Sequence, residues 1–204
     1  MSSVCEKLLT SCIAPSCDNP IFSGIESTAY IFNKSEIASL TYDSTNRNVV
    51  TAITMKTYED DGQDVAYVGY KLIQLGKEPF SGVTTSMTEG NVQNNFTETV
   101  VFTLPDNSPS ASVILDMIAN GSFTVILNNE YEGSDGRGKF QIYGAKKALK
   151  CTAIEREAYG DNNGAWTITL TAENCPNSSI FVEHKTGADV DTESYLDGLV
   201  DCGE

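Results

Sequence analysis

Residues 96–127, FTETVVFTLPDNSPSASVILDMIANGSFTVIL, decide the fold that the sequence predicts. From Phe96 to Leu104, apolar residues alternate with positions that are mostly threonine, and Glu98 is the exception on the apolar face. Phe123, Val125 and Leu127 repeat this alternation at the end of the stretch. A period of two is typical of a strand with one face on a core and the other on water or on a neighbouring subunit. The stretch therefore predicts two half-buried strands.

A single helix is predicted between these two strands. Ser108 is a suitable N-cap, Pro109 suits the first helical position, and Asn120-Gly121 ends the helix. Most of its residues are apolar, and we expect it to be heavily buried for its length. The side that we expect to face the core consists of Ala111, Ile114, Leu115 and Ile118, extended by Val113 and Met117.

The rest of the chain also favours strands. Residues 47–56 and 166–171 are rich in β-branched and aromatic residues, and residues 59–64 read as a turn. Residues 65–75 are apolar at consecutive positions, which predicts a strand that is central or covered on both sides. Residues 146–158 fit either a helix or a strand. We therefore expect a mainly β (α+β) fold, a β-sandwich or barrel of two packed antiparallel sheets with one main helix.

The chain divides into an expected N-terminal arm (1–26), a β-sandwich core (27–182) and an acidic C-terminal tail (183–204). Inside the core, residues 76–95 show no lasting periodicity, and a loop of this length in a compact domain is usually a lid, a binding loop or a disordered segment. Apolar residues in this loop and in the tail are candidates for contact with another subunit. These candidate contact residues are Phe80, Val83, Met87, Tyr195 and Leu199.

Charge and composition exclude several classes of protein. The 204 residues include 28 acidic and 13 basic ones, giving a formal charge of -15, and a protein that coats nucleic acid needs clustered Lys and Arg instead. No apolar run approaches the 18 residues of a membrane-spanning helix, and the first residues lack the apolar block of a secretion signal. We therefore expect no membrane association.

Candidate catalytic and metal sites are weak. The six cysteines lack a C-x-x-C pair, which favours ordinary thiols over structural bridges or a zinc site. The sole histidine, His184, lies in a polar stretch and favours a solvated surface role. Residues 131–139 form a glycine-rich segment that favours a hairpin turn over a phosphate cradle, and the acids of residues 59–64 do not match a calcium loop. We expect neither catalysis nor a cofactor, although an enzyme that uses only carboxylates stays an alternative.

The order of these elements resembles that of the tail-tube and tail-ring structural proteins of tailed bacteriophages. The resemblance covers residues 25–182: strands, a long loop, a strand ending in VVFTLP (100–105), one helix and several further strands, with GAWTITLTAE (164–173) near the end. The arm and the acidic tail have no counterpart in that family.

The resemblance implies a non-catalytic virion protein, assembled in the host cytoplasm. Copies of the subunit would form a ring, hexamer-like, that stacks on other tail proteins and surrounds a channel for DNA. A negative wall suits DNA passage without sequence-specific binding, because it repels phosphate. The alternative is a β-sandwich binding module of a phage or bacterium, such as a head decoration or host-contact protein, in which exposed tyrosines would cluster on one loop face.

Overall fold

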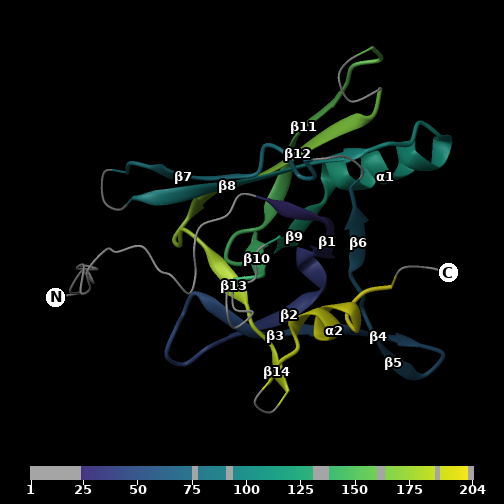
Figure 1. The fold of residues 1–204 in the computed structure, drawn as a ribbon. Coiled ribbons are helices and arrows are strands. Elements are labelled where there is room, and N and C mark those ends of the chain that lie inside the picture. Colours follow the sequence, from purple (N-terminus) through teal and green to yellow (C-terminus); the bar gives the residue numbers. More distant parts are fainter. Residues whose placement is uncertain are drawn as a thin grey trace.

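The computed structural model describes residues 24–74, 78–90, 94–130, 138–159, 164–186 and 189–201 (Figure 1). Nearly all of the expected arm, four of the six cysteines and most of the glycine-rich segment lie outside these residues. The described part is mainly β with one main helix and packed sheets, so the predicted fold class is confirmed.

Strands form most of the described structure. In chain order they are β1 (Ile25–Asn33), β2 (Ile37–Tyr42), β3 (Val49–Met55), β4 (Thr57–Asp60), β5 (Gln63–Ala66), β6 (Tyr70–Ile73), β7 (Thr84–Thr88), β8 (Asn95–Leu104), β9 (Ser122–Asn129), β10 (Phe140–Tyr143), β11 (Leu149–Arg156), β12 (Trp166–Cys175), β13 (Ile180–Val182), β14 (Lys185–Thr186) and β15 (Asp189–Val190). The helices are η1 (Lys34–Glu36, a 3-10 turn), α1 (Pro109–Asn120) and α2 (Thr192–Asp197).

Eleven of the described strands form one continuous sheet that branches at β9. One edge of β9 pairs with β1, which in turn pairs with β6. The other edge pairs with β11 at its start and with β10 along the rest. From there β11-β12-β8-β7 runs one way and β10-β13-β3-β2 runs the other. The β1–β9 pair is therefore the centre of the molecule, with sheet layers on both sides of it (Figure 1).

The central pair separates two hydrophobic clusters, because alternate side chains of a strand point to opposite faces. Ala29 and Ile31 of β1 pack with β8, β12 and α1, whereas Tyr30 and Phe32 pack with β2, β3, β13 and α2. All four side chains are buried. Because both faces of this strand pair are buried, the molecule has two hydrophobic cores, one on each face of the pair.

The described helix α1 matches its predicted ends but not its predicted burial. The Ser108 hydroxyl accepts a hydrogen bond from the Ala111 N–H, Pro109 opens the helix, and the N–H of Gly121 bonds to Ile118 at its end. Only one seam of the helix is buried, which consists of Ala111, Leu115 and Ile118. The expectation that Val113, Ile114 and Met117 also face the core is wrong, since all three are exposed.

Residues 65–75 do not form the covered central strand that was expected. In the part of the chain that the structure describes, β5 pairs only with β4, across the Asp61-Gly62 turn. The chain then leaves the strand before β6 begins. Both turn residues have positive φ, as a two-residue hairpin requires. The β4–β5 hairpin projects from the body, so Val65 is exposed, as are Tyr70 and Ile73 at the ends of β6 (Figure 1).

Two other segments acquire structure that the sequence left open. Residues 84–88 of the expected loop form β7, which pairs with β8 in an unbroken antiparallel register from Thr84↔Thr99 to Thr88↔Asn95. The ambiguous residues 146–158 contain β11, which pairs with β12 and with β9.

The acidic segment after residue 182 packs on the body. Leu196 of α2 is fully buried in the second cluster, and the Asp197 carboxylate contacts the Lys71 ammonium at 2.8 Å and accepts the Tyr30 hydroxyl hydrogen. Gly69 and Leu199 are joined by a backbone hydrogen bond of 2.9 Å. Residues 191–201 therefore pack on the body and do not extend into solvent as a free tail.

Candidate interaction surface

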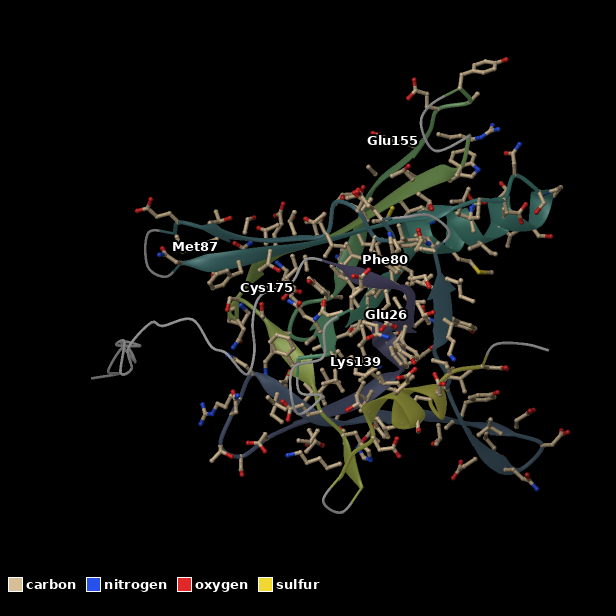
Figure 2. The ribbon with its side chains drawn as sticks, in the orientation of Figure 1. Glu26, Phe80, Met87, Lys139, Glu155 and Cys175 are labelled. Atoms are coloured by element: carbon tan, nitrogen blue, oxygen red, sulfur yellow. The ribbon has the colours of Figure 1, made fainter. Side chains whose placement is uncertain are left out.

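The structure separates the five predicted contact residues into three environments. Phe80 is 3 % exposed and packs in the first cluster, and Val83 is half-buried against the same cluster. Tyr195 and Leu199 are half-buried against the second cluster of their own chain. Met87 is 60 % exposed on β7, away from both clusters (Figure 2). Of the five, Met87 is thus the side chain that is free to meet another molecule.

The outer edge of β7 is an open backbone edge of the described sheet. In the described residues β7 pairs only with β8, and all five of its residues are exposed. Its sequence, Thr-Thr-Ser-Met-Thr, has no charge and no proline. Proteins usually protect a sheet edge with lysine, proline or a bulge, because unpaired backbone groups accept a strand from another chain. None of these devices is present within β7.

The opposite end of the sheet path, β2, is less open. Its residues are also uncharged, but its pairing with β3 shifts register twice, between Ile37 and Ser39 and between Thr41 and Tyr42. Bulges of this kind twist an edge away from a flat partner strand. Neither end of the sheet carries a charge within its edge strand. Because β7 has no register shift, it is the better template for a strand from another chain.

A buried polar cluster lies where β7 and β8 join the body. Glu98, which the sequence placed on an apolar face, is 4 % exposed, and its carboxylate accepts the Gly144 N–H at 2.7 Å. The Lys34 ammonium donates to the carbonyl oxygens of Gly144 and Ala145, at 3.1 and 2.6 Å. Thr124 donates its hydroxyl hydrogen to the same Gly144 oxygen. The Gly144 turn is thus held by groups from η1, β8 and β9.

The electrostatics of this cluster follow from its burial. Burial raises the pKa of Glu98, while the Gly144 N–H and the Lys34 charge oppose that rise. Burial and the nearby Lys146 charge lower the pKa of Lys34, and Glu98 opposes that change. Burial and then the Glu98 charge raise the pKa of Tyr143 to about 12, with an opposing hydrogen bond to Thr85 of β7. These groups meet at the base of the β7–β8 hairpin, where Thr85 pairs with Glu98.

Tyr195 and His184 occupy structural positions. The Tyr195 hydroxyl accepts the Ile53 N–H at 2.7 Å and donates to the Ile53 carbonyl oxygen at 2.8 Å. The His184 ring stacks on Tyr195 with centroids 3.8 Å apart, and its Nδ1 lies 3.0 Å from the Thr51 carbonyl oxygen. His184 is thus held against β3 and is not the freely solvated side chain that its polar neighbours suggested.

The two described cysteines both favour the protonated thiol. Burial raises the pKa of the Cys151 thiol, and burial followed by the Glu98 charge raises that of Cys175 to about 11, so neither thiol ionises readily at neutral pH. Over the described ranges, no group of three or more His, Cys, Asp or Glu side chains could hold a metal ion. No described helix has both the length and the apolar character needed to cross a membrane.

Two further exposed apolar areas were missed by the sequence analysis. One is the outer seam of α1, where Val113 and Met117 are exposed. The other lies near the β4–β5 hairpin, where the rings of Tyr58 and Tyr67 are 4.8 Å apart and Tyr70 is exposed. The signal for the first was present in the sequence, since α1 carries more apolar residues than one buried seam can use.

Comparison with models of protein families, with curated proteins and with solved structures finds no match to this chain.

Proposed function

We propose that this chain is a virion structural protein, a tail-tube or tail-ring subunit that assembles with copies of itself into a ring around a channel for DNA. The observation that carries the proposal is the uncharged, unprotected edge of β7 on a hairpin that projects from the body (Figure 1). A soluble monomer gains nothing from such an edge and risks aggregation through it. A subunit that pairs with its neighbour makes use of it.

The hydrogen-bonded base of the hairpin supports the same proposal. Glu98 and its Gly144 contact fix β8 to the body, so β7 is presented in one orientation. Strand pairing between unlike edges of neighbouring subunits is a head-to-tail contact, which closes into a ring when the rotation between subunits permits. The partner edge of matching chemistry is the uncharged segment 39–41 of β2 at the other end of the sheet, which lies between the two register shifts.

The charge of the chain agrees with a channel protein. The charge of -15 disfavours DNA binding, and a conduit must let the duplex pass without holding it. Other virion tail proteins are the expected partners of the ring faces. This role needs neither a catalytic residue nor a cofactor.

A charge placed on the β7 edge tests the proposal. Met87→Lys is expected to abolish rings and tubes in negative-stain electron microscopy of concentrated protein and of reconstituted virion tails, because an edge lysine opposes strand addition. The matched control is Tyr159→Lys, which adds the same charge at a fully exposed site on the β11–β12 hairpin. Assemblies that survive Met87→Lys, or a wild-type protein that forms none even in tail samples, would contradict the proposal.

Point substitutions are preferable to deletion of the whole segment. Removing residues 76–95 also removes Phe80 from the core, so lost assembly would not be distinguishable from lost folding.

The tyrosines near the β4–β5 hairpin favour a second candidate function, a binding module of the head-decoration or host-contact type. The rings of Tyr58 and Tyr67 contact each other, Tyr58 and Tyr70 are exposed, and aromatic faces are suited to sugar rings. Under this function, Tyr58→Ala with Tyr70→Ala is expected to weaken binding to bacterial surface glycans on an array at least about tenfold, with Tyr159→Ala as the control. Absence of glycan binding by the wild type would eliminate this candidate.

A further inference from the structure

The exposed side of α1 is an apolar seam without a partner among the described residues. Val113, Ile114 and Met117 are 53 %, 45 % and 67 % exposed. Together with Ser110 they occupy positions i, i+3, i+4 and i+7, which lie along one face of a helix. This outer seam runs beside the buried seam of Ala111, Leu115 and Ile118, so α1 has two packing faces and its own chain covers one.

The outer seam is neutral in a strongly acidic protein. Asp116 is the only charged residue in α1; it borders the seam next to Val113, three residues away, and lies farther round the helix from Ser110 and Met117. Two copies of a chain with charge -15 repel each other over most of their surface. A contact between copies therefore forms most easily where side chains are uncharged and apolar, and the four residues of the outer seam are uncharged, with Asp116 at its border.

The spacing of the seam is self-complementary. If two α1 helices pack antiparallel about a two-fold axis that passes between Val113 and Ile114, Ser110 lies opposite Met117 of the partner subunit. Val113 then lies opposite Ile114 of the partner subunit. The longest side chain of the seam thus faces the shortest, and the same contact occurs twice, as a two-fold interface requires. Antiparallel helices also align their dipoles favourably.

We propose that α1 packs antiparallel against α1 of a second copy of this chain through Ser110, Val113, Ile114 and Met117. This contact uses a different surface from β7 and does not depend on ring formation. If the β7 contact and the α1 contact both form, each α1 contact links a subunit of one ring to a subunit of a second ring that faces it, across a two-fold axis. A polar, open-ended tube does not contain such an axis, so the α1 contact fits the ring form of the proposed function and not the tube form.

Sedimentation velocity of the purified full chain over a range of concentrations tests this contact. Met117→Lys is expected to raise the dissociation constant of the dimer about 100-fold, since each dimer contains the substitution twice. The matched control is Ser112→Lys, which adds the same charge on the opposite side of the same helix and is expected to change the constant less than about twofold. Circular dichroism of each variant checks that the fold is retained.

A side-chain exchange identifies the occupant as a second copy. Ser110→Met alone places two methionines opposite each other, and Met117→Ser alone leaves a gap, so each is expected to weaken the dimer. The double variant restores one long and one short side chain at each contact and is expected to recover the wild-type dissociation constant within about threefold. A monomeric wild type, or a double variant no tighter than the single ones, would overturn the proposal.

The two proposed contacts fail separately. Met87→Lys removes the edge of β7 from pairing but leaves the outer seam intact, so this variant is expected to remain an α1-mediated dimer. Loss of the dimer in Met87→Lys would show that the dimer forms through β7, and the proposal for α1 would then be wrong.

Discussion

Leu196→Ala is expected to lower the free energy of unfolding by about 3 kcal/mol, one of the largest effects of any single substitution in α2. Leu196 is fully buried in the second cluster, and truncating it leaves a cavity between α2 and the strands beneath it. The measurement is urea-induced unfolding of the isolated chain at a concentration at which it is monomeric. A monomer is essential, because the test separates packing within the chain from packing on a neighbour.

The control for this prediction is Leu199→Ala. Leu199 is half-buried on the same segment, so its truncation is expected to cost only about 1 kcal/mol. If Leu196→Ala changed the monomer by no more than Leu199→Ala, the segment would not be docked in the isolated chain. The docking on a neighbour that the sequence suggested would then be the better interpretation.

The strand–helix–strand order at residues 96–127 was predictable because each of its signals is local. Alternation marks β8 and β9, and the Ser108 cap with Pro109 marks the start of α1. These features depend on side chains a few residues apart, so a single sequence contains all the information needed. The turn at Asp61-Gly62 was predictable for the same reason.

The sidedness of α1 could not be predicted, because two apolar seams lie next to each other on one helix. Ala111, Leu115 and Ile118 form one seam, and Val113 and Met117 belong to the other. Periodicity identifies the apolar arc of a helix but not which part of it the chain itself covers. That choice depends on the strands of the first cluster, which come from distant parts of the sequence.

The strand β7 was missed for a different reason. Its residues, Thr84 to Thr88, show no apolar alternation because all of them are exposed. The strand exists through its backbone pairing with β8, and strand propensity depends strongly on such context. The partner of Tyr195 was equally hidden, since it bonds Ile53 across 142 residues of sequence.

Glu98→Ala is expected to lower the free energy of unfolding by about 3 kcal/mol, because it leaves the buried Gly144 N–H without its acceptor and removes a charge that opposes that of Lys34. The matched control, Thr97→Ala, removes a half-buried side chain next to Glu98 on β8 and is expected to cost about 1 kcal/mol or less. Urea-induced unfolding measures both. Equal effects of the two substitutions would show that Glu98 does not hold the Gly144 turn.

The pH dependence of Glu98→Gln tests the electrostatics of the same site. Glutamine keeps an acceptor but does not titrate, so the difference in unfolding free energy between wild type and Glu98→Gln isolates the carboxyl group. Burial raises the folded-state pKa above the ordinary value of 4.5, so the folded protein still holds the proton at pH values where the unfolded chain has released it. The stability of the wild type relative to Glu98→Gln is therefore highest at low pH.

That relative stability is expected to fall as the pH rises from about 4.5 through the raised pKa of the folded state, and to level off above it. Urea-induced unfolding of both proteins from pH 4 to pH 8 (roughly the range in which a raised carboxyl pKa is visible) measures the difference. A relative stability that instead rises over this range would mean that the Gly144 N–H and Lys34 stabilise the carboxylate more than burial destabilises it. Glu98 would then be a charged anchor of the β7–β8 hairpin rather than a carboxyl group that favours its protonated form.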